Sequence, residues 1–125
     1  MTLLLRREFI AVAAGAAFGG TSENRFGMFG KLIAHRGRRD ALVQHLLTAA
    51  ELVGKARGCE LYVVHTSPAE PDTVWVTEVW RSRADHDASL SINGVRELIA
   101  KARPLIAEIP EPILTIPVGG KGLSS

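Results

Sequence analysis

Hydrophobic and polar positions along the chain change their period repeatedly, and each change predicts a new element. The stretch from Phe26 to His35 is a mostly apolar run of strand length, closed by the basic, glycine-containing segment RGRRD. From Arg39 onward the apolar residues recur at helical spacing, at Leu42, Leu46, Ala49, Ala50 and Val53. This pattern predicts an amphipathic helix, and Gly58 supplies the stop expected just past its end.

Two strands joined by a short turn are predicted after this helix. The segment CELYVVHTS is rich in β-branched and aromatic residues, and PAEPD then supplies two prolines and an aspartate for a turn. The segment TVWVTEVWRS is the strongest strand pattern in the chain. Glu78 and Trp80 share one of its faces, and Trp75 lies on the opposite face. The short link predicts an antiparallel hairpin.

The last third of the chain alternates helical and extended patterns. Ser82 begins SRAD, a sequence that caps a short helix running to about Leu90. The segment SING interrupts it, and helical spacing resumes at Val95, Leu98, Ile99, Ala102 and Ile106. Pro104 ends or kinks this second piece near Arg103. The final apolar segment, Pro112–Val118, is predicted to be a strand at a sheet edge.

The order of these elements predicts the fold class. Strand, helix, strand, strand, broken helix, strand is the βαββαβ order of a ferredoxin-like α+β domain. Such a domain has a four-stranded antiparallel sheet with its helices on one face. The other face of the hairpin is too apolar for water, which indicates a partner. Two copies stacked through these faces would bury it, so we expect a homodimer.

Composition narrows the function classes. The 125 residues suffice for one domain, 46% of them are hydrophobic, and the net charge is +2. Arginines spread along the chain instead of forming a basic stripe, which argues against nucleic-acid binding. Cys59 is the single cysteine, so no intrachain disulfide or CxxC site can form. The four histidines are widely separated, and the sequence therefore predicts no metal site.

Residues 1–25 differ from the rest and are set apart from the domain, which we place at residues 26–123. Arg6 and Arg7 precede an alanine- and glycine-rich apolar run from Phe9 to Gly20, an arrangement typical of a twin-arginine export signal. The run is too short and weakly hydrophobic for stable membrane insertion. A periplasmic location follows if the signal functions. The alternative is a plain N-terminal extension on a cytoplasmic protein.

An ordered set of short motifs carries a family resemblance. Gly58-Cys59 and Tyr62, an acidic proline-containing turn, and then Glu78-x-Trp80 stand in the segment from residue 58 to 90. The helix entry RGRRDALV and the tail PVGGKGL flank it. Together they resemble the antibiotic biosynthesis monooxygenase family of small dimeric α+β barrels. The resemblance covers roughly residues 27 to 123, and no single motif in it is very specific.

The resemblance implies a cofactor-independent monooxygenase that oxidises a quinol or a related electron-rich aromatic with dioxygen. Family members differ in activity, so two alternatives stay open: a non-catalytic dimer that binds a small ligand, and an oxygen-independent enzyme acting on a small carbonyl signal. Many relatives carry a histidine where this chain has Ser89. The first strand also lacks the asparagine found in haem degraders, so the resemblance argues against haem chemistry.

Candidate site residues follow from this resemblance and from local chemistry. Trp80 would line an aromatic slot, with a core or interface role as the alternative. His86 is the candidate acid–base group, because imidazole titrates near neutral pH. Its alternative is a solvated position on the helix surface. Glu78 is expected to accept a hydrogen bond across a subunit interface, because a carboxylate on an apolar strand needs a partner.

Tyr62, His65 and Arg96 complete the expected substrate-binding set. Arg96 and Arg103 share a helix face, and one of them is a candidate for holding an anionic substrate group. For His65 a structural or exposed position is the alternative. The remaining candidates are expected to be surface or core residues: His35, His45, Arg81, Arg83, Cys59 and Trp75.

Overall fold

The strands and helices follow the predicted order. The structure, a computed structural model, describes residues 24–123. The expected export signal lies in residues 1–23, outside the described residues. The elements are β1 (Phe26–Ala34), α2 (Arg39–Gly54), β2 (Cys59–Thr66), β3 (Thr73–Trp80), α3 (Arg83–Ser89), α4 (Val95–Ala102), a 3₁₀ turn (Arg103–Leu105), β4 (Ile106–Glu108) and β5 (Ile113–Thr115).

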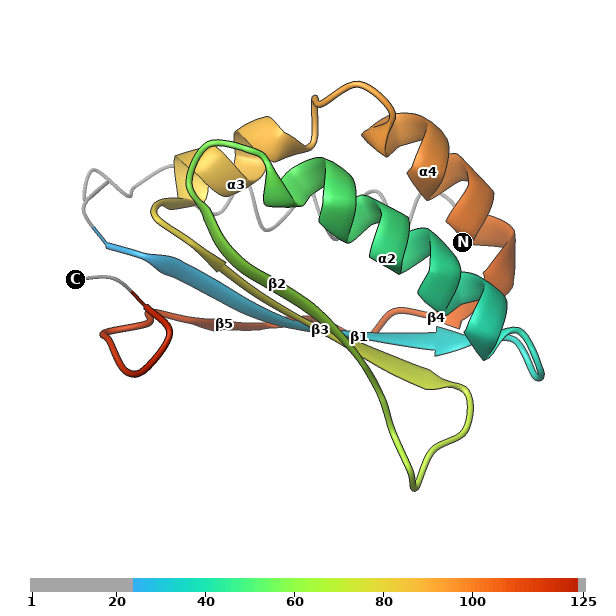
Figure 1. The fold of residues 1–125 in the computed structure, drawn as a ribbon. Helices are drawn as coiled ribbons and strands as arrows, with labels where there is room; N and C mark the ends of the chain where they lie inside the picture. Colours follow the sequence, from blue (N-terminus) through green and yellow to red (C-terminus); the bar gives the residue numbers. More distant parts are fainter. Residues whose placement is uncertain (1–23, 124–125) are drawn as a thin grey trace.

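One antiparallel sheet forms the base of the fold. Its order is β2-β3-β1, and β4 and β5 both pair with the outer edge of β1. Helices α2, α3 and α4 cover one face of this sheet, the upper face in Figure 1. The predicted ferredoxin-like α+β fold and the β2–β3 hairpin are therefore confirmed. Each helix within residues 24–123 is too short or too polar to cross a membrane.

Strand alternation decides which side chains enter the core. Met28 of β1 lies opposite Glu78 of β3, and Leu32 lies opposite Val74. All four are buried beneath the helices, so the even-numbered positions of both strands face inward. Trp75 belongs to the odd-numbered set and points to the other face, as predicted. We call that second face, which none of the helices within residues 24–123 covers, the open face of the sheet.

Helix α2 ends earlier than the sequence predicted. Its last residue is Gly54, and Gly58 lies beyond it at the entrance to β2. Gly58 has a φ of +84°, and its carbonyl oxygen accepts a 2.8 Å hydrogen bond from the backbone N–H of Arg81. A Cβ atom at this position would run into the carboxylate of Asp85. Glycine is therefore needed here for the close approach of β2 and α3, and not as a helix stop.

The capped helix after β3 is confirmed. Ser82 is the N-cap of α3, and its Oγ accepts a 3.1 Å hydrogen bond from the backbone N–H of Asp85. Helix α3 is only seven residues long, and a turn ending at Gly94 leads into α4. The cap aligns α3 across the end of β3, which brings His86 over the strand.

Two predicted boundaries in the C-terminal part of the chain were wrong. Ile106, which the helical spacing had included, begins β4, and the predicted strand Pro112–Val118 shrinks to β5. Strands β4 and β5 pair with β1 in the same direction along the same edge, so they are two parts of one interrupted strand. Pro110 and Pro112 lie between them, and proline has no N–H for the ladder.

The core between the sheet and the helices consists of two apolar clusters. One surrounds Leu42 and Val74, and the other surrounds Phe26 and Trp80. Tyr62 and Ile99 pack against both clusters. The boundary between the clusters is where the candidate site lies.

The close approach at Gly58 generates the first prediction. Gly58→Ala should lower the free energy of unfolding by about 2 kcal/mol, because alanine is strained at positive φ and its Cβ displaces Asp85. Gly54→Ala is the matched control, because Gly54 is exposed at the end of α2 with open space around it. That substitution should leave stability unchanged or raise it by up to about 1 kcal/mol. Urea denaturation measures both, and equal effects would contradict the assignment.

Candidate functional site

A cavity of about 90 Å³ lies between the helices and the sheet, where the two core clusters meet. Its wall is mostly aliphatic, with side chains from β1, α2, α4 and β4. Polar groups enter from three elements: Glu78 from β3, His86 and Ser89 from α3, and His45 from α2. The phenol of Tyr62 comes from β2. The fold thus places an acid, two imidazoles and a phenol around one largely apolar space.

Glu78 is the most unusual group in the cavity wall. Its side chain is only 7% exposed, and its Oε1 accepts a 2.9 Å hydrogen bond from the indole Nε1 of Trp80, which is fully buried. The two residues share a strand face, as predicted, and the bond runs along β3. Burial raises the pKa of Glu78, because the charged form loses its hydration, while the nearby His86 and the indole hydrogen bond act in the opposite direction.

His86 is buried, which excludes the solvated position that the sequence left open. The side chain is 2% exposed, and its ring lies 4.9 Å from the Phe26 ring and 5.8 Å from the Trp80 ring, edge-on to the indole. Helix α3 is short. The two aromatic rings that enclose its His86 belong to strands β1 and β3 and hold the imidazole in place. A histidine enclosed in this way and facing a cavity suits acid–base chemistry.

Asp87 orients the imidazole of His86. Its Oδ1 lies 2.9 Å from Nδ1 of the ring. A carboxylate accepts hydrogen bonds and does not donate them, so Nδ1 carries the hydrogen of this pair. In the neutral ring, the lone pair is then on Nε2. This is the arrangement in which a histidine acts as a base through Nε2.

Tyr62 faces the same cavity from β2. Strand pairing puts it opposite Glu78. Burial, followed by the negative charge of Glu78, raises the pKa of the Tyr62 phenol well above its usual range. Tyr62 therefore stays protonated and can act as a hydrogen-bond donor. Cys59, on the same strand, is partly buried and likewise has a raised thiol pKa, first from burial and then from Glu78.

The structure separates the other two expected binding residues from this group. His65 is exposed on the open face, where its Nε2 lies 2.9 Å from the hydroxyl of Thr77. Arg96 is exposed on α4 and does not line the cavity. Tyr62 and His86 line the cavity, whereas His65 and Arg96 lie elsewhere. Trp80 takes the core position expected as its alternative, packed against His86 but outside the cavity wall. The separation of Tyr62 and His65 follows from strand alternation, because their positions differ by an odd number.

Two titratable residues of the cavity wall were not assigned a site role from the sequence. His45 was expected to be a surface or core residue, yet it lines the cavity with Leu46 and Ala49. Its position three after Leu42 and four before Ala49 is the signal that puts it next to the apolar stripe. Glu78 was expected to face a second subunit, but its side chain points into the helix-covered core.

The arginine side chains near the site lie outside the cavity. The guanidinium carbon of Arg83 lies 5.3 Å from the centre of the Phe26 ring, and Arg103 belongs to the turn after α4. Of the residues that the structure describes, no lysine or arginine lines the cavity. Within the same part of the chain, His, Cys, Asp and Glu side chains nowhere gather in a group of three suited to a metal ion.

Solved structures share this fold over nearly their whole length. A protein from Chloroflexus aurantiacus J-10-fl, provisionally named an antibiotic biosynthesis monooxygenase, is 45% identical, with a TM-score of 0.74 over 80% of this chain and 99% of that one. A protein from Caulobacter crescentus CB15 with the same provisional name is 18% identical, with a TM-score of 0.72 over 78% and 93%. A Deinococcus radiodurans protein, again so named, is 21% identical, with a TM-score of 0.67 over 80% and 99%.

The fold and the family comparison together classify the chain. The fold, with its cavity between one sheet face and the helices, defines a small ferredoxin-like α+β protein. The model of the antibiotic biosynthesis monooxygenase family matches residues 26–101, and the chain belongs to that family. No curated protein is significantly similar in sequence. The match ends before the edge strand formed by β4 and β5.

The raised pKa of Glu78 generates the second prediction. A carboxyl with a raised folded-state pKa holds its proton more tightly in the folded protein, so stability falls as the pH rises through that pKa. The unfolding free energy of the wild type, relative to that of Glu78→Gln, should therefore be highest near pH 4 and decline toward pH 8. Denaturant titrations at pH 4, 6 and 8 measure the difference. A constant difference would show that Glu78 is not held in a desolvating site.

Proposed function

We propose that this protein is a cofactor-independent monooxygenase that oxidises a quinol or a related electron-rich aromatic with dioxygen. The observation that carries the proposal is the buried pair of Glu78 and His86 at the wall of an apolar cavity. The family membership supports the oxygenase class. The Tyr62 ring lines the cavity and suits contact with an aromatic substrate, while the Trp80 and Phe26 rings pack against His86 behind the cavity wall.

In the proposed reaction the substrate itself supplies the electrons. His86 Nε2 takes the proton of a ring hydroxyl, while Asp87 holds Nδ1–H. Glu78 stabilises the resulting imidazolium, and the electron-rich anion then reduces dioxygen. For hydroquinone the balance is quinol plus dioxygen giving hydroxyquinone plus water, with one oxygen atom entering the ring. The aliphatic wall keeps water away from the anion.

Oxygen uptake with hydroquinone tests this proposal and gives the third prediction. His86→Asn should lower kcat by about 10²-fold or more, because a positioned general base contributes on that scale. His35→Ala, which alters an exposed histidine in the loop after β1, should leave kcat unchanged. The reaction without protein supplies the blank, since quinols react slowly with oxygen unaided. Circular dichroism checks that both variants fold.

The outcomes separate the alternative functions. Saturable uptake above the blank that His86→Asn abolishes supports the oxygenase. Ligand binding without oxygen uptake would instead favour the non-catalytic binding protein. Turnover of a small carbonyl compound without dioxygen would favour the third candidate. Unchanged uptake in His86→Asn would remove this residue from the mechanism.

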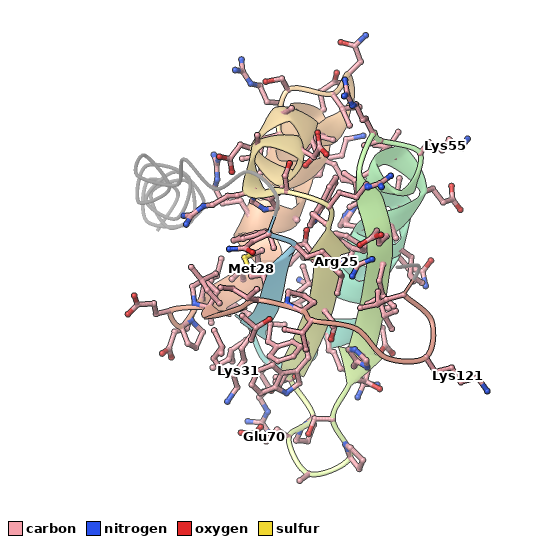
Figure 2. The ribbon with its side chains drawn as sticks, turned by 90° about the vertical axis from the view of Figure 1, so that its left-hand side faces the viewer. Arg25, Met28, Lys31, Lys55, Glu70 and Lys121 are labelled. Atoms are coloured by element: carbon pink, nitrogen blue, oxygen red, sulfur yellow. The ribbon has the colours of Figure 1, made fainter. Side chains whose placement is uncertain are left out.

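We further propose that the functional unit is a homodimer joined through the open face. Exposed apolar side chains gather there, with Phe29 39%, Val63 40% and Ile113 55% exposed. The segment after β5 already lies over part of this face, packed against Gly27, and Figure 2 shows it passing in front of the strands toward Lys121. At the hairpin end, Lys31 and Glu70 form a 3.7 Å ion pair beside Trp75. An apolar centre with a charged rim suits an interface.

A charge in the open face provides the fourth prediction. Val63→Glu should convert the dimer to a monomer at micromolar concentration, because burying an unpaired carboxylate costs several kcal/mol. Leu47→Glu is the control: Leu47 is similarly exposed, at 44%, but lies on α2, away from the open face. Light scattering after gel filtration measures the mass. A wild-type monomer, or a Val63→Glu dimer, would contradict this interface.

A further inference from the structure

The charges around the cavity carry information about its ligand beyond the proposed reaction. The cavity wall contains the carboxyl of Glu78 but, within residues 24–123, no lysine or arginine. Of the two arginines that the sequence suggested as anchors for an anionic group, Arg96 is exposed on α4 and Arg103 lies in the turn after it, and neither lines the cavity. A ligand carboxylate bound here would therefore join Glu78 as a second acid in a desolvated space, and no lysine or arginine of the described residues would pair with it.

The histidines of the cavity do not supply the missing cation. His86 already faces two acids, with Asp87 on its Nδ1 and Glu78 on the cavity side. His45 enters from a different helix, α2. The two acids, Asp87 and Glu78, are therefore the groups that the His86 imidazole already pairs with, ahead of a ligand carboxylate.

Cavity size sets a second limit. The volume is about 90 Å³. An apolar cavity of about 150 Å³ holds one benzene molecule, so this space admits a single ring only after small side-chain adjustments. A fused two-ring system exceeds it. The small side chains in the wall, Ala49, Ser89 and Ala102, provide the room that exists.

The acid–base pair occupies one part of the cavity wall. Glu78 and His86 lie beside Trp80, in the cluster around Phe26, whereas Leu32, Ala102 and Ile106 belong to the other cluster. A ligand that is complementary to both parts of the cavity wall needs hydroxyl groups toward Glu78 and His86 and an apolar edge toward the aliphatic side chains.

We propose that the cavity selects an uncharged, single-ring, hydroxyl-bearing compound, and that Glu78 is the specificity-determining residue that rejects carboxylated analogues. This inference rests on the proposed function and narrows its substrate class. It excludes acidic aromatic compounds and fused-ring quinols as preferred ligands.

Anaerobic binding tests the inference separately from the oxygenase reaction. Isothermal titration calorimetry at pH 8, without oxygen, compares three ligands: hydroquinone, 2,5-dihydroxybenzoate, which adds one carboxylate to the same ring, and menadiol, which adds a second ring. Hydroquinone should bind most tightly. The carboxylated ligand should bind about 100-fold more weakly, because its carboxylate would lose its hydration in a space that already holds an acid and, within residues 24–123, no lysine or arginine. Menadiol should also bind more weakly.

The variant Glu78→Gln assigns the rejection to one residue. It should bring the affinities for hydroquinone and 2,5-dihydroxybenzoate closer by about 10-fold or more, because an amide replaces the acid that a ligand carboxylate would meet in the cavity. His35→Ala serves as the control and should keep the wild-type ratio. If Glu78→Gln folds poorly, the wild-type affinity ratios still decide the size and charge preferences.

The results overturn different statements. Equal or tighter binding of 2,5-dihydroxybenzoate by the wild type, or preferred binding of menadiol, would overturn the inference. If folded Glu78→Gln keeps the wild-type ratio of the affinities for hydroquinone and 2,5-dihydroxybenzoate, Glu78 is not the residue that rejects the carboxylated ligand. Absence of hydroquinone binding would overturn the inference as well. The predicted selectivity without any oxygen uptake in air would leave the inference standing and remove the oxygenase proposal.

Discussion

The hydrogen bond from the Trp80 indole to the Glu78 carboxyl, 2.9 Å long, is the constraint around which the site is built. A carboxyl loses its hydration on entering a core, and this bond recovers part of that loss. Both residues lie on the inward side of β3, so the bond also depends on the strand register. A slip by one residue would turn Glu78 and Trp80 outward and bring Trp75 into the core. Strand register, core packing and cavity chemistry therefore depend on one another.

Helix α3 links this strand to the imidazole. The Ser82 cap and the close approach of Gly58 to Asp85 hold the start of α3 against the entrance of β2. One turn later the helix presents His86 above Trp80. The helix is too short to be stable alone, so its orientation comes from these contacts and not from its own propensity. The acid–base pair thus combines a residue fixed by strand pairing with one fixed by helix docking.

This difference explains how far the sequence predicted the structure. Period-2 alternation placed Glu78 with Trp80 and put Trp75 on the other face, because that information is local to one strand. The burial of His86 was not predictable in the same way, because it depends on Phe26, which lies far away in the chain. The expected binding set failed to assemble for similar reasons, since His65 and Arg96 point away from the cavity. The interrupted edge strand required knowledge of which strand it pairs with.

The two faces of β3 connect the cavity to the proposed dimer. Glu78 and Trp80 lie on the helix-covered side, where Glu78 lines the cavity, and the residues between and before them, Thr77 and Val79, face the open side. A partner packed on the open face would restrict the movement of β3 and so hold Glu78 in its desolvated position. Without that support, water reaching the strand would lower the cost of ionising the carboxyl. In the proposed dimer, one strand would therefore carry both the interface and the acid of the cavity.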